Sequence, residues 1–259
     1  KKIKAQRYIT STDSGMLTRK ELLSFNKKTA MVLLVLFVVA FFVYLATGEG
    51  HATYYDYYVR LSDAFLHGRL YLLENPSWLN ELIPNPSGPG YYVVYPPLPA
   101  VLMLPFVAVF GVTLNQTLFG LFFAAATVAL AYLVAKSALA KMQQSTAQSR
   151  RTYVWFAVLF GFGTIFWYLS SIGSVWLIAQ VIATFFMMLA LYESLNKNRP
   201  LLVGLLVGAS FWCRLPTALG IFFFAALAIA QQQNPGWLNK FKAALPYLIR
   251  LAAGMAVFV

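Results

Sequence analysis

Residues 48–95 read GEGHATYYDYYVRLSDAFLHGRLYLLENPSWLNELIPNPSGPGYYVVY, and the organisation of the rest of the chain depends on them. This segment holds five of the eight acidic residues and both histidines, and its prolines and glycines predict a series of turns. The sequence after it is almost entirely apolar. A long loop that keeps carboxylates and aromatic residues in such a chain is the place where chemistry can occur. We therefore expect the functional site in this loop.

The composition predicts an all-α polytopic membrane protein. Hydrophobic residues make up 60% of the 259 residues and charged residues only 11%, whereas soluble globular domains contain about 25% charged residues. The formal net charge of +12 is typical of basic residues on cytoplasmic loops, which set the orientation of a membrane protein. No basic stripe interleaved with aromatic residues follows residue 28, so we expect no nucleic acid partner. The single cysteine, Cys213, excludes an intramolecular disulfide and a cysteine metal site.

Hydropathy and charge together predict about seven transmembrane helices. Residues 1–28 contain eight Lys and Arg against two acidic residues, a net charge of +6, and are expected to form a cytoplasmic basic tail. The transmembrane domain then covers residues 29–259, with residues 48–95 as its extracytoplasmic loop. The predicted spans are 29–47, 118–134, 153–170, 175–192, 201–212, 215–230 and 245 onward.

This arrangement predicts a multi-pass protein of a bacterial-type plasma (inner) membrane with a cytoplasmic N-terminus. The chain begins without Met and stops at Val259 inside an apolar run, so we also expect it to be truncated at its C-terminal end.

Residues 96–111 are apolar but are predicted not to cross the membrane. They form a run of about 16 residues, which is short for a span, and they contain Pro97, Pro99 and Pro105. If this run crossed, the following loop with Lys136 and Arg150 and no acidic residue would lie outside, against the positive-inside rule. We therefore predict a juxtamembrane or re-entrant helix here.

The loop itself contains a predicted interfacial helix at residues 54–67, ended by Gly68. Its charged residues follow one another at spacings of four, three and four, which places them on one face of a helix. That face holds Asp56, Arg60, Asp63 and His67, while Tyr58, Leu61 and Phe65 fall on another. The pattern indicates a helix with its apolar side in lipid or protein and its charged side towards a water-filled cleft.

Arg214 lies in the sequence FWCRLPT between two apolar segments. An unpaired arginine in hydrocarbon costs a few kcal/mol, so this residue needs either an anionic partner or access to the headgroup layer. A guanidinium group suits a phosphate in two-point geometry, which favours a lipid phosphate as its ligand. The alternative is an arginine that only extends to the headgroups.

These features resemble the membrane glycosyltransferases of the GT-C fold. The resemblance rests on a first span, a long acidic outer loop with an interfacial helix, the turn YPPLP before a short helix ending in Phe110-Gly111, a basic inner loop, and Arg-Leu-Pro after a glycine-containing span. It covers roughly residues 29–232. The most similar groups that we can name are the bacterial aminoarabinose transferases and the protein O-mannosyltransferases.

The resemblance implies an inverting transferase that moves a sugar from a polyprenyl-phosphate donor to a hydroxyl acceptor on the extracytoplasmic side. It implies a carboxylate after the first span as general base or metal ligand, with Asp56 as the first candidate and Asp63 as the second. Arg214 and Arg69 would bind the donor phosphate, and His67 and Tyr95 would contact the acceptor or sugar. A carboxylate-bound Mg or Mn ion is left open. The expected partners are the lipid-linked sugar donor, membrane lipids and other subunits of a membrane complex.

The sequence leaves two other interpretations open. The family usually carries an adjacent Asp-Glu pair after the first span, but here the corresponding stretch is Tyr54-Tyr55-Asp56-Tyr57. This difference favours a catalytically inactive structural subunit with the same fold, in which Asp56 simply pairs with Arg60. A transporter would require inverted repeats and charged residues at mid-membrane, which the sequence does not show.

Overall fold

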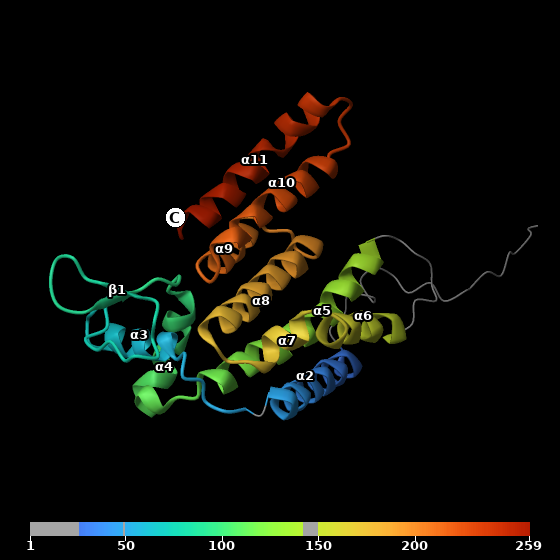
Figure 1. The fold of residues 1–259 in the computed structure, drawn as a ribbon. Helices are drawn as coiled ribbons and strands as arrows, with labels where there is room; N and C mark the ends of the chain where they lie inside the picture. The colour runs from blue at the N-terminus through green and yellow to red at the C-terminus, as the bar shows by residue number, and fades with distance from the viewer. Residues whose placement is uncertain (1–25, 49, 142–149) are drawn as a thin grey trace, which may run out of the picture.

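The computed structural model describes residues 26–48, 50–141 and 150–259. This part is mostly helical, with a single short β-hairpin among the described residues. Figure 1 shows long helices side by side, with the smaller elements of residues 50–113 gathered at one end of them. The predicted basic tail lies almost entirely outside the described residues.

Three described helices have the length and apolar composition needed to cross a membrane: α2 (Lys27–Gly48), α5 (Gln116–Lys141) and α8 (Val175–Leu195). Two shorter apolar helical segments are α9 (Pro200–Phe211) and the joined pair η2 (Leu215–Leu219) and α10 (Gly220–Ala230). The last helix, α11 (Trp237–Ala256), contains Pro246 and three basic residues. The fold is therefore that of a helical membrane protein with three helices of full spanning length, fewer than the seven expected.

The predicted span at 153–170 is not one continuous helix. It is divided into α6 (Arg150–Phe162) and α7 (Phe166–Ser171) at Gly163. The Thr164 side chain accounts for the break locally, because its hydroxyl donates to the Phe160 carbonyl at 2.7 Å and accepts the Phe166 amide at 3.1 Å, which begins a new helix. The neighbouring Gly161 is closely packed, since a Cβ atom there would come within 2.8 Å of the Val128 side chain.

The elements after α2 form a compact cap. They are α3 (Tyr57–Leu66), the antiparallel strands β1 (Leu82–Pro84) and β2 (Tyr91–Val93), α4 (Leu98–Phe110) and the single turn η1 (Gly111–Thr113). The helix predicted at residues 54–67 is confirmed over most of its length, although it begins at Tyr57 and not at 54. Gly68 follows it with φ +70°, a conformation that suits glycine at a helix end. The hairpin was not predicted.

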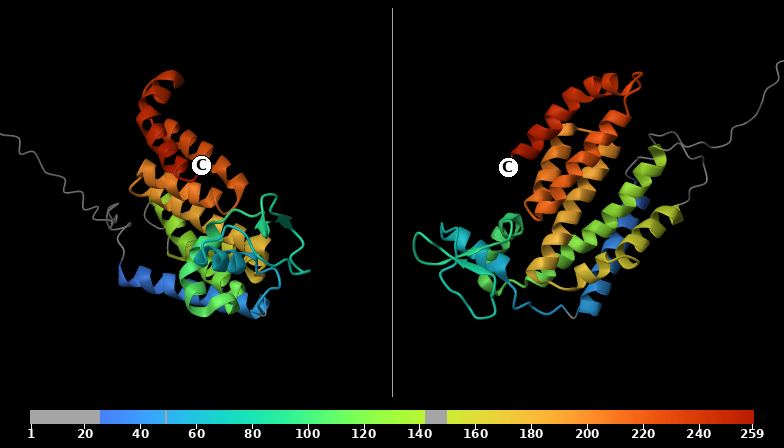
Figure 2. Two further views of the ribbon diagram at one scale, coloured as in Figure 1. Left: turned by 90° about the vertical axis from the view of Figure 1, so that its left-hand side faces the viewer. Right: turned by 45° about the horizontal axis from the view of Figure 1, so that its top comes forward.

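The cap and the long helices meet at one end of the molecule, as the right-hand view in Figure 2 shows. The side-chain amide of Gln116, at the start of α5, donates to the backbone carbonyls of Tyr55 and Gly173 at 3.2 and 2.7 Å. The Leu98 amide at the start of α4 donates to the Trp212 carbonyl at 3.2 Å, at the end of α9. Because α4 begins beside the end of α9 and leads through η1 to the start of α5, both of its ends lie at the cap end of the bundle.

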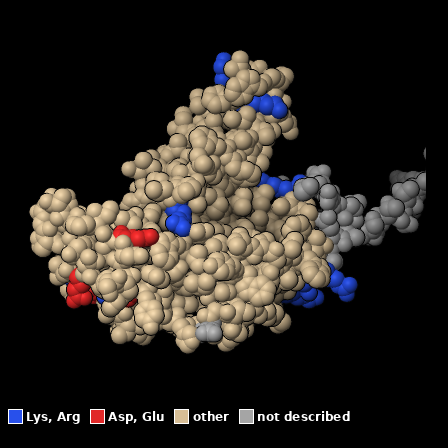
Figure 3. Space-filling model, viewed as in Figure 1, with Lys and Arg blue, Asp and Glu red and all other residues tan. Residues whose placement is uncertain are grey.

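Charged residues are divided between the two ends of the molecule. Of the described carboxylates, all except Glu193 lie in the cap, and in Figure 3 the red atoms on this face lie at the end where α3 and β1 are found. The opposite end is formed by the start of α2, the end of α5 and the α8–α9 turn, where Lys141 Nζ donates to the Ser194 carbonyl at 3.1 Å. The basic residues at the helix ends there are Lys27, Lys28, Lys136, Lys141, Arg150, Arg151, Lys197, Arg199, Lys240 and Lys242.

Candidate functional site

Asp56, the first candidate base, is ion-paired. It stands immediately before α3, and its Oδ1 lies 2.9 Å from Nε of Arg60, one helical turn later. The Arg60 guanidinium carbon lies 6.0 Å from the centroid of the Trp78 ring, at the outer limit of a cation–π contact. The intrahelical pair that the sequence left open as an alternative is therefore present. The Asp56 carboxylate therefore faces the Arg60 guanidinium and not an open space for an acceptor hydroxyl.

Arg214 and Asp56 do not line the same cavity. Asp56 is not among the residues that line the cavity around Arg214. The side chain of Tyr58, two residues after Asp56, is fully buried and belongs to the same apolar cluster as Cys213, the residue before Arg214.

The second candidate, Asp63, lines a cavity of about 250 Å³ at the C-terminal end of α3, here called the charged pocket. Its carboxylate Oδ2 lies 3.6 Å from Nδ1 of His67, which also contacts the Asp63 carbonyl at 2.9 Å. Arg69 lines the same pocket, and its Nε is buried without a hydrogen-bond partner. The complete lining is Arg60, Asp63, Ala64, Arg69, Leu72, Leu73, Glu74 and Val112. Asp63 and Arg69 thus line one pocket, with His67 beside Asp63, and Arg214, which was expected to bind the donor phosphate together with Arg69, does not line it.

Arg214 lines a separate cavity of about 540 Å³ between α8 and η2, here called the arginine pocket. Its guanidinium donates to the backbone carbonyl of Trp176 at 2.9 Å. No carboxylate lines this pocket, and Arg214 forms no ion pair within the described part of the chain. The other lining residues are Gln180, Ala183, Thr184, Met187, Pro216 and Thr217. Gln180 and Thr184 were missed in the sequence, although polar residues four apart in an apolar span were a usable signal.

Trp176 connects Arg214 to a carboxylate that the sequence did not single out. The indole N–H of Trp176 donates to Oε2 of Glu81 at 3.1 Å. The ring of Tyr55 packs against that of Trp176 with centroids 4.7 Å apart, and the Tyr57 hydroxyl accepts the backbone amide of Glu81 at 3.1 Å. Glu81 is therefore the cap carboxylate most directly linked to Arg214. Nothing in its sequence context distinguished it from the other acidic residues of the loop.

Tyr95 has a packing role in this arrangement. Its ring lies edge-on against those of Tyr57 and Tyr58, with centroids 5.5 and 6.3 Å apart. The Tyr95 hydroxyl is buried and has no hydrogen-bond partner. Burial in the same layer raises the pKa of the Tyr57 and Tyr58 hydroxyls above their ordinary value. The tyrosines thus hold the inner face of α3 against the bundle.

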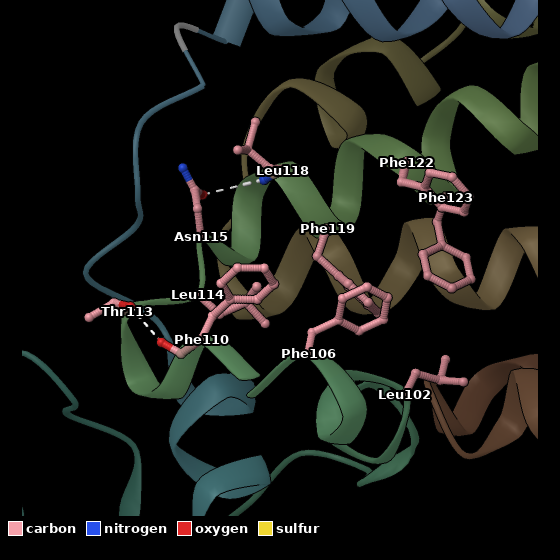
Figure 4. Close-up of a pocket in the computed structure, with 10 residues that line it drawn as sticks. All are labelled: Leu102, Phe106, Phe110, Thr113, Leu114, Asn115, Leu118, Phe119, Phe122 and Phe123. Carbon is pink, nitrogen blue, oxygen red and sulfur yellow. Dashed lines mark hydrogen bonds between the residues drawn. The ribbon is translucent and has the colours of Figure 1, made fainter. Parts of the chain in front are cut away.

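An apolar groove of about 650 Å³ lies between α4 and the start of α5. Figure 4 shows that its walls are mainly phenylalanine rings, with Phe106 from α4 facing Phe119 from α5 at a centroid distance of 5.4 Å. The lining residues are Leu102, Phe106, Phe110, Thr113, Leu114, Asn115, Leu118, Phe119, Phe122 and Phe123. A groove of this composition suits a hydrocarbon chain.

The described residues contain no group of three or more His, Cys, Asp or Glu side chains that could hold a metal ion. The Mg or Mn ion that the sequence left open therefore has no ready set of protein ligands there, and no catalytic step is assigned to it.

Comparison of the chain with protein-family models, with characterised proteins and with solved structures finds no match. The resemblance to GT-C glycosyltransferases consequently rests on the sequence features given above.

Proposed function

We propose that this protein is an integral-membrane transferase of the GT-C type, which uses a polyprenyl-phosphate sugar as donor and a hydroxyl as acceptor. The observation that carries the proposal is the arginine pocket. The Arg214 guanidinium makes one hydrogen bond to the protein and has no carboxylate partner among the described residues, so most of its donors are available to a ligand. A phosphate monoester or diester matches that fork in charge and geometry.

The separation of charge supports an orientation with the N-terminus in the cytoplasm. Basic residues at the end opposite the cap would face the cytoplasm, and the acidic cap would face outwards. Seven helical passes between the two ends fit this orientation if α6 with α7, α9, η2 with α10, and α11 complete the crossing in addition to the three long helices. In this arrangement the arginine pocket opens near the outer leaflet.

The chemistry requires a proton acceptor and a stabilised leaving group. The acceptor hydroxyl oxygen forms a bond to the anomeric carbon, the bond from that carbon to the phosphate oxygen breaks, and the hydroxyl proton passes to a carboxylate. Arg214 would stabilise the negative charge on the departing polyprenyl phosphate. Glu81 supports this scheme better than Asp56, because it is linked to Arg214 through Trp176 and is not paired with a cation. Asp56 and Asp63 remain predicted bases.

A binding experiment tests the proposal. The purified protein is titrated with a polyprenyl monophosphate and with the corresponding polyprenol, which has no phosphate. We expect the phosphate form to bind more tightly and Arg214→Gln to weaken its binding by about tenfold or more, the value of one charge-assisted hydrogen bond. Arg250→Gln, which removes the same charge from an exposed position in α11, is the control. Equal binding of both lipids, or no effect of Arg214→Gln, would overturn the proposal.

The Asp56–Arg60 ion pair favours one alternative, a catalytically inactive structural subunit of the same fold. Such a subunit would show no preference for the phosphate lipid and would be purified from membranes in a stable complex with other chains. The same titration, followed by mass measurement of the intact complex, separates the two functions.

A further inference from the structure

The charged pocket and the apolar groove share the turn η1. Val112 of this turn lines the charged pocket, whereas the adjoining Phe110 and Thr113 line the groove. Only Leu114 and Asn115 separate η1 from the first residue of α5, a helix of spanning length. The two cavities therefore adjoin at η1, and one is lined by four charged residues whereas the other is lined almost entirely by apolar ones.

Four charged residues line the pocket, and one of them is ion-paired: Arg60 with Asp56. The Asp63 carboxylate lies 3.6 Å from the ring of His67. Arg69 and Glu74 form no ion pair with another described residue, and the Arg69 Nε is buried with no hydrogen-bond partner. A buried polar group without a partner is unfavourable unless a ligand or water completes it. The pocket therefore offers one cation and one or two carboxylates to a ligand.

The groove extends from η1 along α5. Leu118 and Phe122 are one helical turn apart, and with Phe119 and Phe123 they extend the apolar wall over about 8 Å along the helix axis. Leu118 and Phe122 are 41% and 55% exposed, so the groove is open along its length. In Figure 4 the rings of Phe106, Phe119 and Phe123 follow one another along it. A hydrocarbon chain that enters at η1 can lie against these rings.

We propose that this site binds a phospholipid whose headgroup carries both a phosphate and a primary ammonium, as in phosphatidylethanolamine. Arg69 contacts the phosphate, Glu74 and Asp63 accept hydrogen bonds from the ammonium, and an acyl chain occupies the groove. A choline headgroup cannot donate such hydrogen bonds because its nitrogen has no N–H. A headgroup with a phosphate and no ammonium leaves the carboxylates unpaired next to a second negative charge. This site is separate from the arginine pocket and does not depend on the transferase proposal.

Native mass spectrometry of the purified protein in detergent tests this proposal. The protein is mixed in turn with phosphatidylethanolamine, phosphatidylcholine and phosphatidylglycerol of identical acyl chains. We expect phosphatidylethanolamine to bind about tenfold more tightly than the other two, which corresponds to about one charge-assisted hydrogen bond. Equal binding of all three lipids would overturn the proposal, since apolar surfaces of a membrane protein hold lipids without regard to headgroup.

Two variants locate the binding site. Glu74 is exposed, so Glu74→Gln should leave the fold intact and should abolish the preference for ethanolamine over choline. Arg69→Gln should weaken the binding of all three lipids, and Arg69→Lys should restore part of the lost affinity. Asn80→Ala, which changes an exposed polar residue in a different part of the cap, is the control and should retain the preference. A preference that survives Glu74→Gln would show that the selective site lies elsewhere.

A third measurement separates a lipid from a free headgroup. Leu118→Trp places a large side chain in the groove and should weaken the binding of phosphatidylethanolamine. Glycerophosphoethanolamine, which has no acyl chains, should compete only weakly with the lipid for the wild-type protein. Competition by glycerophosphoethanolamine at the same concentration as the lipid would overturn the role of the groove and would indicate a pocket for a small soluble zwitterion.

Discussion

Glu81 and Arg214 each form a hydrogen bond with Trp176, Glu81 with its indole N–H and Arg214 with its backbone carbonyl. The Glu81 carboxylate accepts the indole N–H at 3.1 Å, and the Arg214 guanidinium donates to the backbone carbonyl at 2.9 Å. Glu81 belongs to the cap and Arg214 follows α9, so the tryptophan fixes the cap to the membrane helices at the edge of the arginine pocket. A ligand phosphate bound to Arg214 would therefore have a carboxylate held nearby by a rigid ring.

If the protein is a transferase, Glu81→Gln should lower the turnover number by about 100-fold or more, the usual contribution of a general base. The amide keeps an oxygen that can accept from Trp176, so binding of a polyprenyl-phosphate sugar should change little. The measurement is release of polyprenyl phosphate from such a donor, together with its dissociation constant. Asp56→Asn is the comparison, and it should have the smaller effect because Asp56 is already paired with Arg60. A larger loss in Asp56→Asn would return the catalytic role to Asp56.

Hydropathy predicted the apolar helices, and the spacing of charged and apolar residues before Gly68 predicted α3 and its end. These features depend on neighbours within a few residues. The break at Gly163 was missed because it depends on the Thr164 hydroxyl competing for backbone groups in a segment that is otherwise uniformly apolar. The hairpin was missed because its strands are only three residues each and lie in a segment dominated by turn residues.

The candidate site was less predictable than the fold. The spacing of Asp56 and Arg60 could indicate a pair, and the structure confirms it. The link from Glu81 through Trp176 to Arg214 spans residues 95 and 38 positions apart, and no periodicity relates them. The face of α3 that is buried was likewise decided by tertiary packing, since Tyr57, Tyr58 and Leu61 are buried there. Long-range contacts of this kind cannot be derived from local pattern alone.

The hydroxyls of Tyr57 and Tyr58 should differ in their effect on stability. Tyr58→Phe should be neutral or raise the free energy of unfolding by about 1 kcal/mol, because it removes a buried hydroxyl that has no hydrogen-bond partner. Tyr57→Phe should lower it by about 1 kcal/mol, because the Glu81 amide loses its acceptor. Reversible unfolding in mixed micelles measures both values. A marked loss of unfolding free energy in Tyr58→Phe would mean that the hydroxyl has a hydrogen-bond partner such as an ordered water.

The same two residues predict the response to alkaline pH. Burial raises the pKa of both hydroxyls in the folded protein, so the neutral forms favour folding. Their contribution is complete below the unfolded-state pKa of about 10 and is lost as the pH rises above it. We expect the melting temperature to fall above about pH 10, and to fall less steeply in Tyr58→Phe than in the wild type. If the melting temperatures of Tyr58→Phe and the wild type fall in parallel as the pH rises, ionisation of the Tyr58 hydroxyl is not a cause of the loss of stability.

Gly204 allows α9 and α11 to pack in direct backbone contact. A Cβ atom there would overlap the Leu251 carbonyl, and Gly208 one turn later meets Phe258, so the two form a small-residue motif in α9. Gly204→Ala should lower the free energy of unfolding by about 2 kcal/mol or more, the usual effect of overpacking. Gly220→Ala is the matched control, since its Cβ would meet only the flexible end of Met187. If both variants unfold alike, close packing of α9 on α11 is not what holds the last helix in place.

The proposed orientation can be tested with introduced cysteines, because the native Cys213 is fully buried and should not react in the folded protein. Ser87→Cys lies in the exposed turn of the β1–β2 hairpin, and Lys242→Cys lies near the start of α11 at the opposite end. In intact cells a membrane-impermeant maleimide should label the first variant and reach the second only after permeabilisation. A third variant, Thr113→Cys, follows α4 and should label from outside like Ser87→Cys, since α4 begins and ends beside the cap. Labelling of Thr113→Cys from the cytoplasmic side alone would mean that α4 crosses the membrane, and the assignment of every later helix end would then be reversed.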